Sequence, residues 1–478
     1  MNKGMCKRFL GLFLMGSLLL GNLTGCSEEK KVIEPMEAEK SLAISSDAIG
    51  GDDVMPISGY YGPYANVVSL NGVTLPNLVS EEFFEALADC GVNLVSHSIT
   101  DYATAPQIVE RILEYGEKYG IGIVIKDEAL IELGQENVSL AEISLQLSKY
   151  MNSPAFAGIY ICDEPYTDTY YTVDVPDRDI HRYEKIAPIL NQQFDFLNYQ
   201  NALGGSELKT VHGDYKAYLY EYCETLKPDY LSFDFYPFIY GDKTEEELPH
   251  TMYFNNLSVA RLVAQEKGIP FWVFIQAGGN FSDAGEAFDT EEYYPNEWQF
   301  DWNINTCLAF GAQGLNYFSL MQPYHFSYAE SEPHDFERNG MIGVAGNKNR
   351  WFYYAKNISS HLSAIDNVLM NSVSKGVLAS GDDAIEDTSY ADYAMLDGTS
   401  WRELKSVEGD AIVGCFNYQG KTALYVVNYS YEYAQLIDLT FEDEYDITMI
   451  QGGETSKIKS DGMTLDMAAG EGVLLVFE

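Results

Sequence analysis

Basic side chains are scarce in this sequence. Lys and Arg together number 29 against 72 Asp and Glu, and the formal net charge is −43 over 478 residues. A surface of this sign repels phosphate groups, which excludes nucleic acids and anionic lipid surfaces as favoured partners but leaves neutral ligands unaffected. Tyrosine is abundant by contrast, with 36 residues, and aromatic residues make up 14% of the chain. Flat amphipathic rings of this kind suit sugar binding as well as core packing.

Histidine and the short motifs of several enzyme classes are also lacking. The chain has 7 histidines and no His-Glu-x-x-His sequence. It has no Gly-x-Ser-x-Gly elbow, no Walker phosphate loop, and no Gly-x-Gly-x-x-Gly after the first predicted strand. The sequence therefore predicts neither a metal site nor a bound cofactor.

No apolar run is long enough to cross a membrane. Three basic residues precede a short apolar run over residues 9–20, which is followed by Leu-Thr-Gly-Cys ending at Cys26. These are the parts of a secretory signal, and the last four residues resemble the bacterial lipobox, in which the cysteine is lipidated. We expect a signal peptide over residues 1–25, a lipid anchor on Cys26, and a flexible tether over residues 26–54. The protein would then lie outside the cytoplasm, attached to the bacterial cell membrane or cell surface through lipid alone. An ordinary cleaved signal with an incidental cysteine is the alternative.

Cysteine is rare and irregularly spaced. Two of the seven cysteines fall within the first 26 residues, which leaves an odd number that cannot all pair, and their spacing matches no zinc pattern. Because each remaining cysteine has apolar neighbours, we expect buried free thiols at Cys90, Cys162, Cys223, Cys307 and Cys415.

One unit of strand, loop and amphipathic helix recurs between residues 55 and 368. The predicted strands cover residues 56–61, 92–98, 120–126, 156–164, 194–199, 230–236, 271–276 and 314–320. Helix-capping signals fall between them: Ser80 and Gly91 bracket residues 81–90, and Asn296 with Gln299 has the spacing of a capping box. Eight strands alternating with eight helices predict an α/β fold, a parallel (β/α)8 TIM barrel, with a doubly wound open sheet as the alternative.

The pattern changes after about residue 368. Short β-prone runs separated by Gly, Asp and Asn turns cover residues 411–415, 422–428, 436–441, 446–450 and 472–477. They predict a small all-β sandwich domain over residues 369–478. We expect this domain to pack against the barrel and to complete the fold.

Active sites of such barrels lie at the carboxyl ends of the strands, where the alternation of side chains decides which residues face the mouth. In the fourth predicted strand Gly158, Tyr160, Cys162 and Glu164 share one face. Since small residues suit the crowded axis, we expect Glu164 to point inward, where apolar surroundings would raise its pKa and fit it for general acid/base catalysis. The alternative is a carboxylate that holds a neighbouring loop or an arginine.

Polar and aromatic residues at the other strand ends are candidates for substrate contacts. By the same alternation we expect Asp234 near the mouth as a second carboxylate. The candidate substrate-binding residues are His97, Asn198, Tyr236, Trp272, Gln276, Trp302, Tyr317 and Gln322. Each could equally be structural, and it is their convergence on one end of the barrel that favours a site.

Three segments carry a resemblance to a known family. They are Gly-Ile-Tyr-Ile-Cys-Asp-Glu-Pro (158–165), Ser-Phe-Asp-Phe-Tyr-Pro (232–237) and Phe-Gly-Ala-Gln-Gly-Leu-Asn-Tyr-Phe (310–318). They resemble strand ends of retaining glycoside hydrolases with clan A TIM barrels, above all the β-galactosidase-like barrels of family 42 and their extracellular relatives. The resemblance spans most of residues 55–478. It implies a carbohydrate substrate and a small closing β domain.

Two departures from the family pattern limit what the resemblance implies. The fourth strand of that clan ends in Asn-Glu, where the Asn holds the sugar 2-hydroxyl and the Glu is the acid/base, whereas here Asp163 precedes Glu164. The seventh strand ends in a nucleophilic Glu, and this chain has Gln276 there. An amide cannot form a covalent glycosyl-enzyme. The resemblance therefore implies a sugar site and an acid, but not the complete retaining mechanism.

Three functions remain open from the sequence. In the first, Glu164 is the acid of a glycoside hydrolase and Asp234 is the base or nucleophile, according to whether the carboxyl groups are about 6.5–9.5 Å or about 5–5.5 Å apart. In the second, Asp163 and Glu164 form the pair of a substrate-assisted N-acetylhexosaminidase. In the third, the barrel is a non-catalytic surface protein that binds glycans through Trp272, Trp302 and Tyr236. The sequence specifies no oligomeric state.

Overall fold

The computed structural model describes residues 48–51, 53–65, 68–70, 73–96, 102, 104–135, 139–169, 178–194, 196–205, 212–238, 247–278, 294–322 and 340–478. The predicted signal peptide with Cys26, nearly all of the predicted tether, and His97 lie outside the described residues. Within the part that is described, no helix is both long and apolar enough to cross a membrane.

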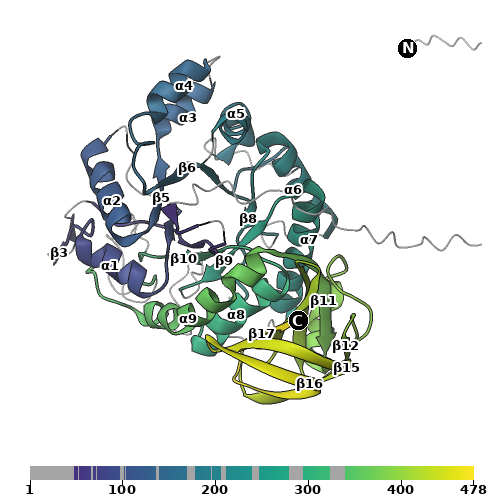
Figure 1. The fold of residues 1–478 in the computed structure, drawn as a ribbon. Coiled ribbons are helices and arrows are strands. Elements are labelled where there is room, and N and C mark those ends of the chain that lie inside the picture. Colours follow the sequence, from purple (N-terminus) through teal and green to yellow (C-terminus); the bar gives the residue numbers. More distant parts are fainter. Residues whose placement is uncertain are drawn as a thin grey trace, which may run out of the picture. The chain divides into compact units, whose positions relative to one another are not determined.

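Eight parallel strands form a barrel at the centre of the molecule (Figure 1). Their order around the sheet is β7-β6-β5-β4-β1-β10-β9-β8, and a bridge between Ala202 and Phe233 joins the two end strands. The predicted (β/α)8 barrel is confirmed, and each predicted strand overlaps an observed one. The strands are β1 Ile57–Gly59, β4 Leu94–Val95, β5 Gly122–Lys126, β6 Phe156–Asp163, β7 Leu197–Asn201, β8 Leu231–Phe233, β9 Phe271–Gln276 and β10 Leu315–Phe318.

Helices surround the barrel strands (Figure 1). A two-stranded ribbon of β2 Val68–Leu70 and β3 Val73–Leu75 also lies outside the barrel sheet. The helices of the barrel are α1 Glu81–Asp89, α2 Pro106–Tyr119, α3 Glu128–Gln135, α4 Leu140–Leu147, the 3-10 helix η3 Ile180–Arg182, α5 Ile186–Gln193, α6 His212–Leu226, α7 Glu247–Lys267, α8 Glu297–Ala309 and α9 Arg350–Met370.

Local signals explain where the helices begin. The Ser80 side chain accepts a hydrogen bond from the Phe83 amide at the start of α1, and Asn296 and Gln299 form the predicted capping box of α8. Such caps satisfy the amide groups that a first helical turn leaves open. Gly91 follows α1 with a φ of 81°, the left-handed geometry that glycine adopts without strain.

The C-terminal domain is a seven-stranded antiparallel sheet in the order β11-β13-β14-β17-β15-β12, with β16 paired to β15. Its hydrophobic side chains form a core separate from the barrel, with members from all seven strands. The sequence pattern missed β11, β12 and β16. The elements are β11 Ser372–Ser380, α10 Asp382–Asp387, η5 Thr388–Tyr390, β12 Leu404–Glu408, β13 Ala411–Tyr418, β14 Lys421–Asn428, β15 Gln435–Gln451, β16 Glu454–Met467 and β17 Gly472–Phe477.

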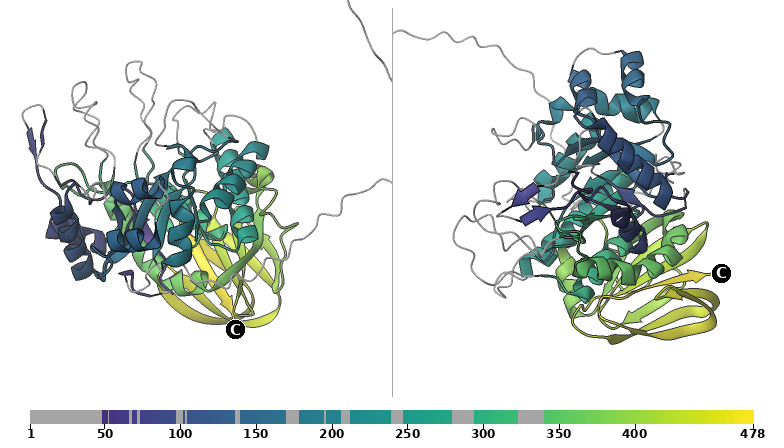
Figure 2. Two further views of the ribbon diagram at one scale, coloured as in Figure 1. Left: turned by 90° about the horizontal axis from the view of Figure 1, so that it is seen from above. Right: turned by 90° about the vertical axis from the view of Figure 1, so that its left-hand side faces the viewer.

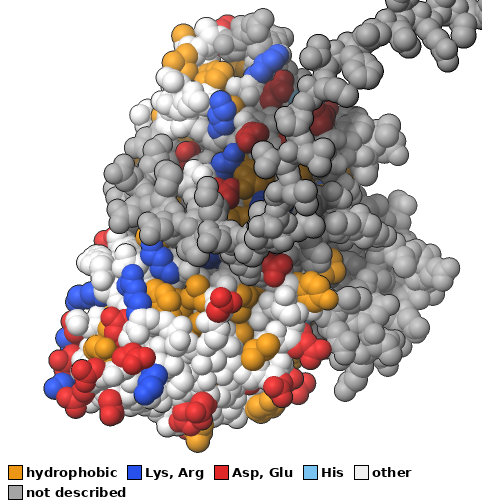
Figure 3. Space-filling view, turned by 90° about the vertical axis from the view of Figure 1, so that its right-hand side faces the viewer, with side chains coloured by type: hydrophobic (Ala, Val, Ile, Leu, Met, Phe, Trp, Pro, Cys, Tyr) orange, Lys and Arg blue, Asp and Glu red, His pale blue; other side chains and the backbone are white. Residues whose placement is uncertain are grey.

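The C-terminal domain packs on the barrel side that carries α8 and α9 (Figures 1 and 2). The Tyr425 hydroxyl on β14 donates to Asn305 Oδ1 on α8 at 2.6 Å and lies 3.0 Å from His361 Nε2 on α9. Figure 3 shows one face of the molecule, with hydrophobic side chains gathered above this lower domain and charged side chains of both signs dispersed over it. Side chains of β13, β14 and β17 also join the barrel's core, so the domain completes the fold.

Large aromatic side chains fill the barrel interior. Tyr199, Tyr230, Trp272 and Phe274 belong to one buried cluster inside the strands, and the rings of Tyr230 and Trp272 lie 4.2 Å apart. Gly158 lets β6 lie close to β7, because a Cβ there would lie 1.8 Å from the Leu197 carbonyl oxygen. This packed layer lies beneath the mouth, so the barrel is a filled core rather than a pore. The five cysteines outside the N-terminal segment are buried and free, as predicted.

Candidate active site

A β-bulge in β6 decides which carboxylate faces the barrel mouth. The register with β7 shifts between Tyr160 and Cys162, so that Ile161 and Cys162 both join the outer core. A bulge of this kind reverses the alternation of every residue that follows. Asp163 consequently pairs with Asn201 and turns toward the mouth. The sequence-based placement of Asp163 on the outward face was wrong because it assumed a regular strand.

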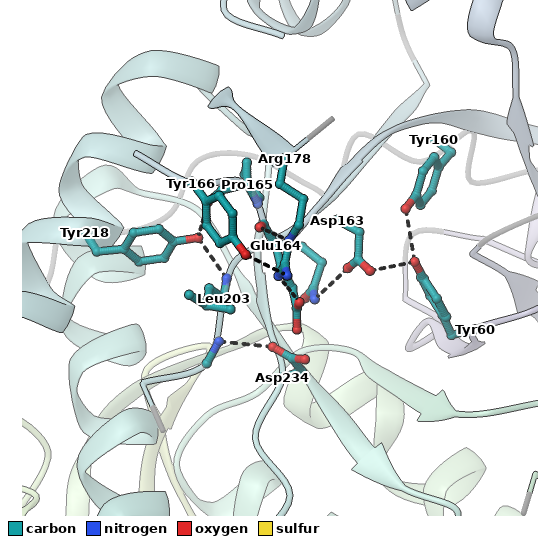
Figure 4. A network of polar contacts seen from close by, with 12 residues as sticks. Tyr60, Tyr160, Asp163, Glu164, Pro165, Tyr166, Arg178, Leu203, Tyr218 and Asp234 are labelled. Carbon is teal, nitrogen blue, oxygen red and sulfur yellow. Dashed lines mark hydrogen bonds and ion pairs between the residues drawn. The ribbon is translucent and has the colours of Figure 1, made fainter. Parts of the chain in front are cut away.

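Glu164 reaches the mouth by a different route. It lies just past β6 with a φ of 45°, in the left-handed region that is unfavourable for residues other than glycine. Its amide donates to the Asn201 carbonyl at 2.8 Å, and the Tyr218 hydroxyl on α6 donates to the Pro165 carbonyl at 2.9 Å (Figure 4). These contacts hold the turn, so Asp163 and Glu164 both face the site although they are consecutive.

Arg178 is the main partner of Glu164. Its guanidinium forms an ion pair with the Glu164 carboxylate, and its Nε donates to the Glu164 carbonyl oxygen at 2.9 Å (Figure 4). The same guanidinium lies 4.7 Å from the centre of the Tyr166 ring. An adjacent cation favours the ionised form of a carboxyl group. This pairing argues against Glu164 as the proton donor that the sequence suggested, and it matches the alternative of a carboxylate held by an arginine.

Asp163 is the carboxyl group of the site whose pKa is raised. Its carboxylate accepts hydrogen bonds from the Tyr60 hydroxyl at 2.8 Å and from Asn201 Nδ2 at 3.1 Å. Burial and the nearby charge of Glu164 nevertheless raise the pKa of Asp163 to about 7, because these two effects outweigh the hydrogen bonds and the Arg178 charge. The side chain remains partly exposed. Asp163 is therefore the group in this pair that can carry a proton near neutral pH.

Asp234, just after β8, is the third carboxylate. Its Oδ1 accepts a hydrogen bond from the Gly204 amide at 3.1 Å. Only glycine fits at position 204, since a Cβ there would lie 1.9 Å from the Asp234 carbonyl oxygen. Figure 4 shows the Glu164 carboxyl group directed toward Asp234. The predicted placement of Asp234 beside Glu164 at the mouth agrees with this arrangement.

Partly exposed aromatic rings line the same mouth. Burial and the charges of Asp234, Glu164 and Asp163 raise the pKa of the Tyr236 hydroxyl, which shows that this ring lies near all three carboxylates. The Tyr236 ring lies 5.6 Å from that of Phe318, and Phe318 lies 5.8 Å from Tyr61. These three side chains are only partly buried, so their faces are available to a ligand.

The side-chain amide of Gln276 is bound to backbone groups. Its Nε2 donates to the Phe238 carbonyl at 2.8 Å and to the Gly278 carbonyl at 3.3 Å, while its Oε1 accepts from the Phe238 amide at 3.1 Å. The predicted role of Gln276 in substrate binding is therefore replaced by a structural one. The side chain fixes the backbone that follows β8.

Two tryptophans that were expected to stack on sugars are buried instead. Trp272 lies in the aromatic layer inside the barrel, and Trp302 packs between α7 and the C-terminal domain beside His250 and Tyr429. Both side chains have 0% exposure. Their size made them obvious candidates, but size also makes them efficient core fillers.

Three further candidates are buried, and two of them point away from the mouth. Asn198 faces α5 and donates to the Asn191 side chain. Tyr317 faces outward and stacks on Phe300 of α8 at 5.6 Å. Gln322 is 1% exposed, and its carbonyl oxygen accepts a bond from the Tyr64 hydroxyl. Asn198 and Tyr317 point outward because successive side chains of a strand alternate between its two faces.

The sequence analysis missed residues that the structure brings to the mouth. Asn201 and Phe318 lie at inward positions of β7 and β10, and Tyr60 follows β1. A strand end placed at Asn201 rather than at residue 199 would have identified the first. Arg178 follows Glu164 by 14 residues and lies outside any strand, so no periodic pattern pointed to it.

The assembled site offers proton transfer between carboxyl groups and an aromatic platform. Asp163 can hold a proton while Glu164 pairs with Arg178, and Asp234 supplies a further carboxylate. In the described part of the chain, no three His, Cys, Asp or Glu side chains are grouped as a metal site requires. Paired carboxyl groups in different protonation states are the arrangement that glycosidic bond hydrolysis requires.

Comparison with solved structures identifies the fold. A GH42 β-galactosidase from G. stearothermophilus superposes with a TM-score of 0.52 at 9% sequence identity, over 92% of this chain and 100% of that one. The two chains share a fold. At this identity the similarity extends to nothing finer.

Other similar structures are more distant. A family 51 α-L-arabinofuranosidase from Bifidobacterium longum has a TM-score of 0.45 at 11% identity, over 89% of this chain and 97% of that one. A β-galactosidase from Marinomonas ef1 has a TM-score of 0.44 at 10% identity over 73% of this chain, which spans 66% of that enzyme. These neighbours are all glycoside hydrolases. No family model and no curated protein matches the sequence.

Proposed function

We propose that the protein is a glycoside hydrolase that cleaves a neutral glycan at the barrel mouth. One observation carries the proposal: Asp163, with its pKa raised to about 7, lies beside Glu164, which is paired with Arg178, within a mouth lined by partly exposed aromatic rings. A neutral acid next to a carboxylate divides the roles of donor and acceptor. The fold shared with a β-galactosidase supports the same reaction class.

The residues divide the reaction as follows. Asp163 gives its proton to the glycosidic oxygen, and the bond from that oxygen to the anomeric carbon breaks. According to the spacing of the carboxyl groups, Asp234 either removes a proton from the water that attacks the anomeric carbon or bonds to that carbon itself. In the second case water then breaks the Asp234 ester while Asp163 takes a proton from that water. Glu164 stays ionised beside Arg178 and stabilises the positive charge that develops on the sugar. The aromatic rings of Tyr61, Tyr236 and Phe318 hold the apolar face of the substrate.

The decisive test compares single variants on a panel of aryl glycosides and short oligosaccharides. Asp163→Asn, Glu164→Gln and Asp234→Asn should each lower kcat/KM by about 10²–10⁴-fold, the usual contribution of positioned acid/base groups. Asp89→Asn is the matched control, because this carboxylate pairs with Lys356 at the end of α1, outside the network at the mouth. Wild-type cleavage that all three variants retain would overturn the proposal. Strict dependence on N-acetylated substrates would instead indicate substrate assistance.

A second candidate is a glycan-binding protein without catalysis. Two observations favour it: the Gln276 amide is engaged by backbone groups, and Glu164 is paired with Arg178. In this case the wild type and the Asp163→Asn variant would bind an oligosaccharide equally well, and neither would release sugar from any member of the panel.

We further propose that Cys26 anchors the protein to the outside of the bacterial membrane. The support is the basic and apolar leader followed by Leu-Thr-Gly-Cys. Incorporation of labelled palmitate that disappears in Cys26→Ser would support this location. Equal labelling of both chains would contradict it.

A further inference from the structure

A second cleft lies between α7 and the C-terminal domain. It has a volume of about 780 Å³ and is lined by the start of α7, by α10 and η5, and by the loop that follows β14. Cavities of about 300–1,000 Å³ are typical of small-molecule sites, so a short oligosaccharide would fit. Its lining includes none of the residues that form the carboxylate network at the barrel mouth.

Tyrosine rings are the main apolar surface of this cleft. Tyr390 belongs to η5 and Tyr433 to the loop after β14, and they are 54% and 52% exposed. Tyr431 lies deeper, edge-on to His250 with 5.7 Å between the ring centres. Two half-exposed rings from separate segments of one cleft offer faces on which the C–H groups of a sugar ring can stack.

Hydrogen-bond acceptors surround the rings. Asp383 and Glu386 of α10 and Glu432 of the loop all line the cleft. In the described part of the chain no three such side chains are grouped as a metal site requires. An ionised carboxylate has two oxygens that can accept hydrogen bonds. A ligand with many hydroxyl donors suits such a lining, whereas an anionic ligand is repelled by it.

The wall formed by the loop after β14 is fixed in place. Asn428 Nδ2 donates to the Tyr433 carbonyl at 3.1 Å, and Ser430 Oγ accepts from the amides of Glu432 and Tyr433 at 3.2 and 3.3 Å. On the inner side the His250 ring lies 5.2 Å from that of Trp302. A surface held by its own hydrogen bonds loses little entropy when it binds a ligand.

We propose that this cleft is a second saccharide-binding site, which holds a neutral oligosaccharide on Tyr390 and Tyr433 through ring stacking and through hydroxyl groups that donate to Asp383, Glu386 and Glu432. The site goes beyond the proposed hydrolysis at the barrel mouth. Because its readout is binding, the test does not depend on whether the mouth cleaves anything.

The test is calorimetric titration of the purified protein with short oligosaccharides of glucose, galactose, mannose and xylose. The double variant Tyr390→Ala/Tyr433→Ala should bind the recognised sugar at least about tenfold more weakly, since each stacked ring contributes on the order of 1 kcal/mol. Tyr353→Ala is the matched control, because Tyr353 on α9 is equally exposed at 52% and does not line the cleft. It should bind as the wild type does.

A third variant separates the two sites. Tyr236→Ala removes a ring from the barrel mouth, so binding in the interdomain cleft should survive it. The proposal is overturned if the double variant keeps wild-type affinity, if Tyr236→Ala alone abolishes all binding, or if no sugar of the panel binds. Binding of the polyamine spermidine without binding of any sugar would also overturn it, because the cleft would then recognise cations.

Discussion

Arg178 binds both the carboxylate and the backbone carbonyl of Glu164, and so fixes the charge and the position of that residue together. The positive charge also acts on the neighbouring acid, since it lowers the pKa of Asp163. Arg178 thus influences which of the two neighbouring carboxyl groups, Asp163 or Glu164, holds a proton.

Replacing Arg178 should move the pH dependence of the site. In Arg178→Gln the pKa of Asp163 should rise above its value of about 7. The acid then keeps its proton to higher pH, so the alkaline limb of a pH profile of kcat/KM should shift upward. Arg182→Gln is the control, because Arg182 pairs with Glu128 at 2.8 Å. An alkaline limb that stays in place would contradict the assignment.

Asp163 should lower the stability of the folded protein once its carboxyl group is ionised. A carboxyl group with a raised pKa binds more protons in the folded than in the unfolded state, so stability falls as pH rises from about 4 to about 7. Asp163→Asn removes this titration. The melting temperature of the variant relative to wild type should therefore increase between pH 5 and pH 8, as measured by thermal denaturation. A difference that is constant over this range would exclude the perturbed pKa.

Two asparagines of β7 form a matched pair. Asn201→Ala removes a donor from the Asp163 carboxylate, which should raise the pKa of Asp163 and shift the alkaline limb upward. Asn198→Ala, on the opposite face of the same strand, should leave the pH profile unchanged because its side chain contacts Asn191. Equal shifts in both variants would show that the strand, rather than the contact, is responsible.

A carboxylate at position 276 should not restore a nucleophile. In Gln276→Glu the side chain would face the carbonyl oxygens of Phe238 and Gly278 without a hydrogen to donate at neutral pH. We expect a loss of about 1–3 kcal/mol in the free energy of unfolding, smaller at acidic pH where the new group is protonated, and no gain in cleavage. Gln313→Glu is the control, since that side chain is less buried and donates to the single carbonyl of Met370. Increased activity in Gln276→Glu would contradict the structural role.

Arg261 should stabilise the contact between α7 and the C-terminal domain. The guanidinium is buried and donates to Ser374 Oγ, the Ser374 carbonyl and the Tyr393 carbonyl, each at 3.2 Å. Burial lowers the pKa of Arg261 to about 10, yet these bonds compensate for the buried charge. Arg261→Ala should lower the free energy of unfolding by about 2–4 kcal/mol in chemical denaturation, because acceptors and a cavity remain. The exposed Arg350→Ala should change it little.

The barrel was predictable because each unit carries its own local signal. Residues 271–275 form an uninterrupted apolar run that fills β9 up to its last residue, Gln276, and the capping box at Asn296 marks the start of α8. The strand and the helix start are determined by residues close together in the sequence, and tertiary packing only reinforces them.

The details of the site were not predictable to the same degree. A bulge between Tyr160 and Cys162 has no signature in the sequence, yet it exchanges the inward and outward faces. Arg178 approaches Glu164 through tertiary structure alone. Trp272 was expected at the mouth, but the barrel axis accommodates large aromatic rings, and the ring lies below the site.

The closure of the barrel bears directly on the chemistry of the mouth. A bridge between Ala202 and Phe233 links β7 to β8. The seam also relies on Ser232 Oγ, which donates to Asn201 Oδ1 at 2.9 Å, and on the close approach of Gly204 to Asp234. In the proposed hydrolysis, Asp163 and Asp234 would act on opposite sides of a sugar, and the seam between β7 and β8 lies between them. Side chains, rather than a long ladder of backbone hydrogen bonds, hold this seam. A single replacement such as Ser232→Ala could widen or narrow that joint. The gap available to a water molecule, and with it the stereochemical outcome of hydrolysis, would then be adjustable without altering any residue that reacts.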